Sequence, residues 1–422
     1  MKCKIEKSIL NGKIICPANK SYTHRAIFLA ALSDGRSIIK KILRANDTIA
    51  TINACRAFGV NMDESDDTIT VTNSIGDTVD GSMINAQNSG TTIRIATAIA
   101  ALSGGNTELT GDASLKQRPM KPILDSLETL GVNTESDGGN PPIRISGKIN
   151  GDHVTIKGDV SSQFITALLI IAPRLENGLV IEIDGNVVSR PYIDLTIATM
   201  KQFGVNVKID VPYKKYTIEH QIYMPTTFTI PSDFSNLALL LSANVLLGDT
   251  LSIRINIGEL PQGDEKIIDI LEKLGVVVTL QDDIITTKSP EFLDGGKFDL
   301  SDTPDLLPAL SILSLKSKNP IEIFNVKHAR YKETDRIAII SNELQKIGIE
   351  VLEKDDGMIL KKTNNLIGTE LNSHKDHRLF MAFFIVAMYI GDCTVSDPDS
   401  VDISYPDFIS DMQNCGAKIS IV

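Results

Sequence analysis

Cysteine is scarce in this sequence, and the five cysteines are widely separated. They occupy positions Cys3, Cys16, Cys55, Cys393 and Cys415, and no two of them form a C-x-x-C pair. An odd number of scattered cysteines fits neither a disulfide framework nor a zinc site. The sequence therefore predicts reduced thiols that are buried in the core.

Two phosphate-binding signatures are also missing. The chain has no G-x-x-x-x-G-K-[ST] motif and no G-x-G-x-x-G after a first strand, so ATP and dinucleotide chemistry have no support. The six histidines show neither H-E-x-x-H nor another metal-ligand spacing, although His374 and His377 share a segment. We therefore expect neither a metal nor a cofactor.

Long apolar runs and an excess of positive charge are absent as well. No stretch is apolar for long enough to cross a bilayer, and the N-terminus has no apolar signal core. The net charge of -11 and pI near 5.1 argue against nucleic acid or a polyanionic membrane as a partner. We expect a cytoplasmic monomer in which any anion site is a local basic pocket.

What the sequence does contain is an internal repeat. A helix-like run that ends in glycine and is followed by a short β-branched strand recurs at roughly 70-residue intervals. The glycines of this pattern are Gly59, Gly131, Gly204, Gly275, Gly348 and Gly416. Between the first two lie a strand-like segment over 68–72 and helix-like segments over 91–102 and 119–130.

Each repeat therefore reads as two helices interleaved with short strands. A period this long exceeds that of most solenoids, so compact α+β units packed in groups are expected. The segment Met224–Ser232 carries two prolines and no helical pattern. It predicts a waist with three repeats on each side.

Charged and small polar residues gather where predicted helices begin. The stretch Arg330–Arg336 holds three cations and two carboxylates just before an apolar-periodic run, with Thr334 or Asp335 as N-cap. Comparable segments are 17–25, 88–94, 116–120, 158–163, 189–192, 302–305 and 374–378. Any one of them could be a solvated first turn.

Repetition favours a ligand instead. The helix dipole disfavours Lys and Arg in a first turn, so cations found there repeatedly need a compensating negative charge. A small molecule with phosphate and carboxylate groups would supply it. Because the segments come from both sides of the waist, we expect the ligand to lie in a cleft between two domains whose closure completes the pocket.

The same segments resemble, over essentially the whole chain and in the same order, the motifs of the 5-enolpyruvylshikimate-3-phosphate synthase family. The motifs are Asn19–Arg25, Asn88–Arg94, Arg118–Met120, Ser161–Gln163, Ser189–Tyr192, Pro304–Asp305, Lys332–Arg336 and Asp376–Arg378. The resemblance implies an α/β fold of two domains, an inverse α/β barrel with three βαβαββ-type repeats in each. It places residues 1–16 with 232–422 in one domain and 17–231 in the other.

The resemblance also implies an activity and a set of site residues. The family transfers the enolpyruvyl group of phosphoenolpyruvate to the 5-hydroxyl of shikimate 3-phosphate and releases phosphate, in the shikimate pathway of chorismate and aromatic amino acid biosynthesis. It would assign the shikimate 3-phosphate site to Ser21, Arg25, Ser161, Ser162, Gln163, Ser189, Tyr192, Asp305, His328 and Lys332. It would assign the phosphoenolpyruvate site to Lys20, Asn88, Gly90, Arg94, Arg118, Gln163, Arg336, His377 and Arg378.

For catalysis, the resemblance makes Asp305 the base toward the 5-hydroxyl and Glu333 the acid that protonates the methylene, with Lys20 assisting. Addition would give a tetrahedral intermediate, and loss of phosphate the enol ether. One difficulty is visible in the residues themselves. Lys332 and Arg336 should favour the ionised form of Glu333, whereas an acid needs its proton.

Three positions depart from the family pattern. His328 stands where Asn is common, so its charge is expected to vary with pH. Ile403 stands where bacterial members carry a Lys, so one cation on the phosphoenolpyruvate side is absent. Ser89 and Ile95 flank Gly90 with unusual side chains, which leaves the response to the inhibitor glyphosate open.

Two other functions remain as alternatives. The sister enzyme UDP-N-acetylglucosamine enolpyruvyl transferase has a catalytic-Cys loop and a Lys-Asn start, whereas Lys20 is followed here by Ser21. A non-catalytic anion-binding module is prompted by Ile403, but the intact Asp305 and Glu333 argue against it.

Overall fold

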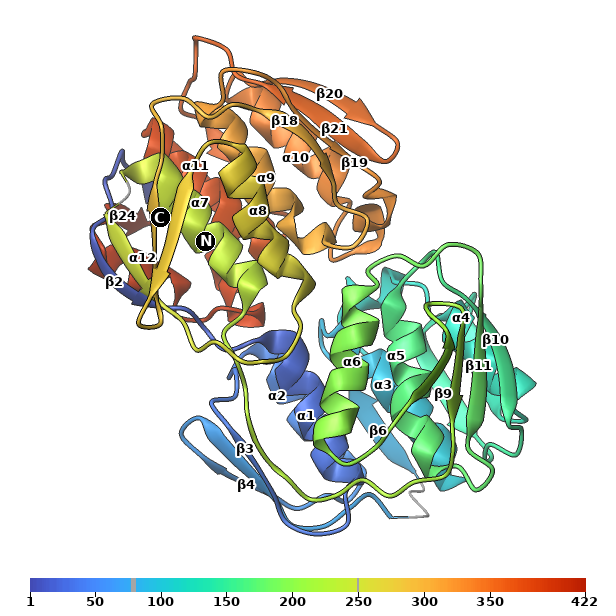
Figure 1. The fold of residues 1–422 in the computed structure, drawn as a ribbon. Helices are drawn as coiled ribbons and strands as arrows, with labels where there is room; N and C mark the ends of the chain where they lie inside the picture. Colours follow the sequence, from blue (N-terminus) through green and yellow to red (C-terminus); the bar gives the residue numbers. More distant parts are fainter. Residues whose placement is uncertain (77–80, 249) are drawn as a thin grey trace. The chain divides into compact units, whose positions relative to one another are not determined.

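The computed structural model describes residues 1–76, 81–248 and 250–422, and they form two compact units (Figure 1). Unit 1 comprises Met1–Pro17, Ser232–Gly258 and Gly263–Val422. Unit 2 comprises Ala18–Pro231 and Glu259–Gln262. Each unit has its own apolar core.

One sheet pattern occurs six times in the described part of the chain. Each sheet has four strands, of which the first two are parallel and the third and fourth are antiparallel to their neighbours. In sheet order, the strands of unit 2 are β14 (Thr227–Thr229), β3 (Ser37–Lys40), β5 (Thr68–Val71) and β4 (Met62–Ser65); β6 (Ser82–Asn85), β7 (Asn106–Thr110), β9 (Asn140–Ser146) and β8 (Asn133–Asp137); and β10 (His153–Lys157), β11 (Leu179–Asp184), β13 (Lys215–Ile218) and β12 (Lys208–Val211).

Unit 1 repeats the same order three times. Its strands are β2 (Gly12–Ile15), β15 (Leu251–Arg254), β17 (Ile284–Lys288) and β16 (Val277–Gln281); β18 (Gly296–Asp299), β19 (Ile321–Phe324), β21 (Gly357–Lys361) and β20 (Glu350–Lys354); and β22 (Glu370–Leu371), β23 (Cys393–Ser396), β1 (Lys2–Ile5) and β24 (Ile419–Ile421). The inverse α/β barrel expected from the sequence, with three repeats on each side, is confirmed.

Three sheets are completed by strands from distant parts of the chain. Strand β2 pairs in parallel with β15, with Gly12 opposite Leu251, and β1 lies between β23 and β24. In unit 2, β14 pairs in parallel with β3, with Thr227 opposite Ile38. The N-terminal strands therefore belong to the unit that holds the C-terminal half.

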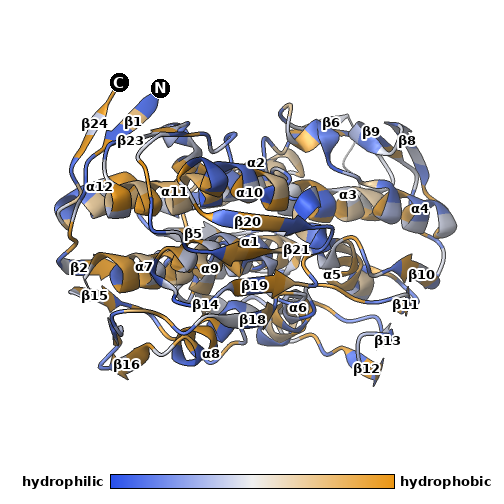
Figure 2. Ribbon diagram, turned by 90° about the horizontal axis from the view of Figure 1, so that it is seen from above, coloured by the Kyte–Doolittle hydropathy of each residue, from blue (hydrophilic) through white to orange (hydrophobic). Residues whose placement is uncertain are grey.

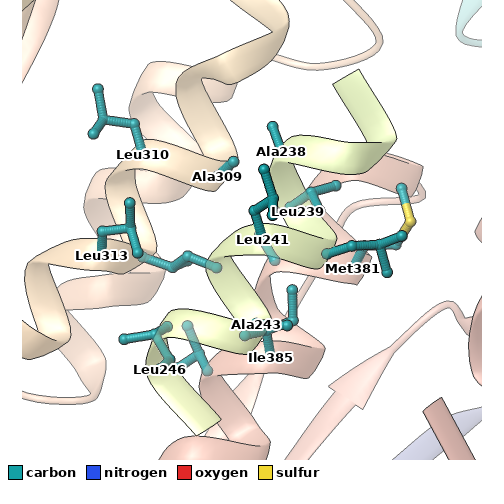
Figure 3. Packing of buried hydrophobic residues seen from close by; sticks show 14 of the residues in the cluster. Ala238, Leu239, Leu241, Ala243, Leu246, Ala309, Leu310, Leu313, Met381 and Ile385 are labelled. Carbon is teal, nitrogen blue, oxygen red and sulfur yellow. The ribbon is translucent and has the colours of Figure 1, made fainter. Parts of the chain in front are cut away.

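The first helix of each repeat is buried almost all round. These inner helices are α1 (Lys20–Leu32), α3 (Gly90–Ser103) and α5 (Ser162–Ile171) in unit 2, and α7 (Phe234–Leu247), α9 (Leu307–Ile312) and α11 (His377–Ile390) in unit 1. Figure 2 shows α7 and α11 mostly in the colours of apolar residues. Figure 3 shows buried side chains of unit 1, among them Leu241, Leu313 and Met381, on neighbouring helical segments. An all-round apolar surface is what a helix in the centre of a core requires.

The second helix of each repeat ends at the repeated glycine. These helices are α2 (Asn46–Ala57), α4 (Lys121–Thr129), α6 (Pro191–Gln202), α8 (Lys266–Lys273), α10 (Arg336–Lys346) and α12 (Phe408–Asn414). The six glycines that follow them have φ between 80° and 108°, which a residue with a Cβ rarely adopts. This left-handed turn explains why glycine recurs at these positions.

Two further findings concern the cysteines and the lengths of the helices. All five cysteines are free and buried, as predicted. Among residues 1–76, 81–248 and 250–422, no helix combines the length and apolar character needed to cross a membrane.

Candidate active site

Arg336 is the centre of the charged cluster in unit 1. It is the first residue of α10, and only 1% of its surface is exposed. Its guanidinium donates to Asp376 through Nε at 2.8 Å, to Asp305 through Nη1 at 2.9 Å and to Glu333 through Nη2 at 2.7 Å. Burial opposes its charge, but Asp376, Glu333 and Asp305 outweigh that effect and raise the pKa of Arg336. One buried cation therefore contacts both predicted catalytic carboxylates.

Asp305 is surrounded by further cations. It lies in the 3-10 turn η4 (Pro304–Leu306), directly before α9. Besides Arg336, it accepts from Arg378 Nη2 at 3.4 Å and faces Lys332 Nζ at 3.6 Å. Burial is the main cause that lowers the pKa of Lys332, and the charge of Asp305 opposes this shift. The predicted residues Asp305, Lys332, Arg336 and Arg378 thus form one cluster.

The N-terminus of α11 fixes one side of this cluster. Asp376 is its N-cap and accepts from the backbone N–H of Arg378 at 2.9 Å. The same carboxylate also accepts from Arg336 and from the hydroxyl of Thr334 at 3.1 Å. His377, the first residue of the helix, is fully buried. Capping and ion pairing therefore hold Arg336 and Arg378 beside each other.

His328 is a buried histidine close to Lys332 and Asp305. Only 6% of its surface is exposed, and burial together with the nearby Lys332 charge lowers its pKa to about 4. Asp305 and Asp302 act in the opposite direction but do not restore the ordinary value. The charge of His328 therefore varies with pH in the acid range, and the ring stays neutral near neutral pH.

This depressed pKa predicts an acid sensitivity. In the unfolded chain His328 binds a proton near pH 6.5, whereas in the folded unit it does so only near pH 4. The unfolded state therefore binds more protons between these values, and stability falls as the pH drops through them, by about 3 kcal/mol. In His328→Asn, the difference in unfolding free energy between pH 7 and pH 4 should shrink by about that amount in urea titrations. An unchanged difference would contradict the assignment.

In unit 2, a second group of predicted residues surrounds Gly90. A Cβ built on Gly90 would lie 3.2 Å from Arg118 Nη1, 3.4 Å from Arg94 Nη1 and 3.6 Å from Gln163 Oε1. Arg94 Nη1 donates to Gln163 Oε1, and Arg118 Nη2 donates to Asn88 Oδ1 at 2.8 Å. Both arginines are buried, with 6% and 7% of their surfaces exposed. Two guanidiniums, one from α3 and one from Arg118 outside it, therefore lie close to the N-terminus of α3.

A third buried arginine is held by neutral groups. Arg25, 1% exposed, donates to the hydroxyls of Thr196 at 2.8 Å and Thr166 at 3.2 Å, and to the carbonyl oxygens of Ser21 and Tyr192. Among the residues that the structure describes, no carboxylate bonds to it. Burial lowers its pKa to about 10. A buried cation without an anion is well suited to an anionic ligand.

Lys20 lies in the first turn of α1 and pairs with Asp47 of α2 at 2.8 Å. One turn further along the two helices, His24 bonds to Thr51 at 2.6 Å, and Thr51 bonds to Thr92 at 2.7 Å. These buried hydroxyls and the imidazole join α1, α2 and α3 and so fix the position of Lys20.

The predicted serines lie at two helix starts. Ser161 is the N-cap of α5 and accepts from the backbone of Gln163, and Ser162 begins the helix. Ser189, two residues before α6, has φ of 55° and is 5% exposed. Its carbonyl accepts from the backbone N–H of Tyr192 at 3.1 Å. A non-glycine residue at positive φ next to a helix start is a feature that functional sites often show.

The polar segments were expected just before their helices, but three of them are part of the helix. Helices α1, α5 and α11 begin at Lys20, Ser162 and His377, so the polar motifs form their first turns. Helix α4 begins later than expected, at Lys121. Ile403 is buried in unit 1 and brings no charge.

Three carboxylates were missed or undervalued. Asp47 and Asp264 were not predicted as site residues, and Asp376 was named only as part of a motif. An acidic residue near a helix start is ordinary N-terminal chemistry, so the sequence gives no signal that it pairs with a distant cation.

Comparison with known proteins identifies the family of the chain. Residues 5–412 match the family model of EPSP synthase (3-phosphoshikimate 1-carboxyvinyltransferase). The chain is 58% identical over 419 residues to a 3-phosphoshikimate 1-carboxyvinyltransferase of Nitrosopumilus maritimus, with 99% of each chain covered. It is 39% identical over 422 residues to the enzyme of that name from Methanosphaera stadtmanae, with 98% and 99% covered.

Solved structures show the same fold. EPSP synthase from Acinetobacter baumannii superposes with a TM-score of 0.81 at 24% identity, with 100% of each chain covered. The enolpyruvyl transferase NikO from Streptomyces tendae reaches a TM-score of 0.80 at 18% identity, with 99% and 98% covered. The chain belongs to the EPSP synthase family, whose members transfer the enolpyruvyl group of phosphoenolpyruvate to shikimate 3-phosphate in the shikimate pathway.

Proposed function

We propose that this chain transfers the enolpyruvyl group to the 5-hydroxyl of shikimate 3-phosphate by addition and elimination, with Asp305 as base and Glu333 as acid. The observation that carries the assignment is the guanidinium of Arg336, which contacts both carboxylates at 2.9 and 2.7 Å. It holds a base and an acid a few ångströms apart, as a reaction that removes one proton and adds another requires.

The arginine-rich positions are proposed for phosphoenolpyruvate. Guanidinium forks suit carboxylate and phosphate oxygens. The proposed residues are Lys20, Asn88, Gly90, Arg94, Arg118, Gln163, Arg336, His377 and Arg378. The clusters around Gly90 and around Asp305 support this assignment, since each brings two arginines together.

The hydroxyl-rich positions are proposed for shikimate 3-phosphate. Ser161, Ser162, Ser189 and Lys332 would bind its phosphate, while Ser21, Arg25, Gln163, Tyr192, Asp305 and His328 would bind the ring. The neutral ring of His328 can donate or accept one hydrogen bond, as the more common Asn would.

The chemistry proceeds in two steps. Asp305 takes the proton of the 5-hydroxyl while the hydroxyl oxygen bonds to C2 of phosphoenolpyruvate. Glu333 delivers a proton to C3. Proton addition at C3 makes C2 electrophilic and gives the tetrahedral intermediate. In the second step C3 returns its proton to Glu333 while the bond from C2 to the phosphate oxygen breaks. The proton held by Asp305 passes to the departing phosphate, which restores the base. Lys20 would stabilise the charge of the departing phosphate.

The acidity of Glu333 remains the chemical difficulty of this scheme, because Arg336 bonds to it. An anionic substrate that bonds to Arg336 would compete with Glu333 for the guanidinium. Release from that ion pair favours the protonated carboxyl. Substrate binding is thus the step expected to prepare Glu333 as an acid.

The deciding experiment is phosphate release by the purified chain. With both substrates present, phosphate and the enol ether product should appear in equal amounts; with either substrate omitted, neither should. UDP-N-acetylglucosamine in place of shikimate 3-phosphate should give no product. Binding of shikimate 3-phosphate without phosphate release would instead support an anion-binding module.

Gly90→Ala should weaken phosphoenolpyruvate binding selectively. The new methyl group would lie 3.2 Å from Arg118 Nη1 and 3.4 Å from Arg94 Nη1, so one guanidinium must shift. We expect KM for phosphoenolpyruvate to rise about tenfold, equivalent to roughly 1.4 kcal/mol, with KM for shikimate 3-phosphate nearly unchanged. Gly76→Ala is the control, because its Cβ would meet nothing within 4 Å. Equal changes in both KM values would contradict the placement of Gly90.

Two further expectations accompany the proposal. The chain should act as a monomer in the cytoplasm, without nucleic acid or membrane partners. Light scattering after size exclusion should then give a mass near 45.9 kDa.

A further inference from the structure

Asp264 is a buried carboxylate that the scheme above does not use. It lies in the 3-10 turn η3 (Gly263–Glu265) of unit 1, directly before α8, and 5% of its surface is exposed. Its Oδ2 accepts from the hydroxyl of Ser235, in the first turn of α7. Within the described residues, its Oδ1 has no hydrogen-bond partner. Half of a buried carboxyl group is therefore unsatisfied, which is costly for an anion.

The surroundings of Asp264 connect it to Asp305. Turns η3 and η4 both pack against α7, so the two turns that carry these carboxylates lie against the same helix. Asp305 and Asp233 act on Asp264 as like charges, and Arg378 acts as an opposite charge. On the adjoining α8, the Lys266 ammonium donates to the carbonyl of Asp299 at 2.7 Å.

We propose that Asp264 is a positioning residue that tunes the proton affinity of Asp305, the base of the proposed reaction. This inference rests on the proposed function, because it needs Asp305 in that role. Asp264 does not touch the reacting atoms in this scheme. It acts through the electric field that it places on Asp305.

The need for such a residue follows from the cations around Asp305. Arg336, Arg378 and Lys332 lie within 2.9 to 3.6 Å of its carboxylate and stabilise its ionised form, which makes it a weak base. An ionised Asp264 opposes that field, because a second negative charge favours protonation of Asp305. Burial and the charge of Asp305 raise the pKa of Asp264 to about 7, so its charge changes near neutral pH.

The electrostatic coupling can be measured without turnover. In chain labelled with ¹³C at aspartate carboxyls, the Asp264 signal, assigned by its loss in Asp264→Asn, should titrate near pH 7. Asp305→Asn should move that titration to lower pH, because a repelling charge is removed. Ser235→Ala should move it to higher pH, since the lost hydrogen bond favours the ionised form. A titration that Asp305→Asn leaves in place would overturn the proposal.

Kinetics tests the consequence for catalysis. In the unaltered chain, kcat should rise about tenfold from pH 6 to pH 8. This is the effect of a tenfold change in the proton affinity of Asp305 when Asp264 ionises. In Asp264→Asn the rise should be less than twofold, and in Ser235→Ala its midpoint should lie at higher pH. A purely structural role would lower stability in both variants and leave the profile unchanged.

Asp402→Asn is the matched control, because burial and Asp399 raise the pKa of Asp402 with no contribution from the Asp305 cluster. It should leave the kcat profile unchanged, and a profile altered as in Asp264→Asn would count against the assignment. If no phosphate is released by the unaltered chain, the proposed function fails, while the carboxyl titration still shows whether the two aspartates are coupled.

Discussion

Arg336→Ala should destabilise unit 1 by about 3–5 kcal/mol, the usual cost of removing one partner from a buried ion pair. The guanidinium is 1% exposed and bonds to Asp305, Glu333 and Asp376, of which Asp376 is fully buried. Its loss would leave these carboxylates close together without their shared cation. Amide hydrogen exchange of α10 and α11 measures the effect within unit 1, where a whole-chain melt would mix two units.

Arg330→Ala is the control for this variant. Arg330 lies six residues earlier and also bonds to two carboxylates, Asp335 and Glu353, both at 2.8 Å. Those partners are 40% and 37% exposed, so water can solvate them once the arginine is gone. We expect a loss below about 1 kcal/mol. A comparable loss in the two variants would mean that burial does not govern the strength of the Arg336 cluster.

The repeat pattern of the fold was predictable from one local feature, the glycine that ends the second helix of each repeat. A helix that ends in a left-handed glycine is fixed by neighbouring residues alone, so Gly59 and its five counterparts were visible in the sequence. The strand partners were not visible in that way. Strands β1, β2 and β14 pair with segments far along the chain, and short apolar runs carry no mark of their partner. Family resemblance supplied what local patterns could not.

The candidate site was predictable for the same local reason. Polar and cationic residues at helix starts mark positions where backbone N–H groups favour anions, and Lys20, Gly90, Arg336 and Arg378 were found there. Their partners depend on tertiary structure. The pairs formed by Lys20 with Asp47 and by Arg336 with Asp376 join different helices.

Local reasoning overlooked part of the compensating negative charge. We expected a ligand to supply it, whereas Arg336, Arg378 and Lys20 bond to the protein's own carboxylates. Arg25 is different, because hydroxyls and carbonyl oxygens hold it. Ligands at Arg336 must therefore compete with carboxylates, while a ligand at Arg25 need not. This difference predicts that the two substrates respond differently when a carboxylate is removed.

Asp305→Asn is the sharpest case of that difference. Turnover should fall about 10³-fold, within the range that a general base contributes, because the amide cannot take the proton of the 5-hydroxyl. Phosphoenolpyruvate should bind at least as tightly as before, since Arg336 and Arg378 lose a competing anion. Single-turnover kinetics and calorimetric titration measure the two effects separately. Asp302→Asn, three residues earlier, keeps Asp305 intact and should change kcat less than threefold. Weaker phosphoenolpyruvate binding with kcat preserved would reverse the assignment and make Asp305 a binding residue.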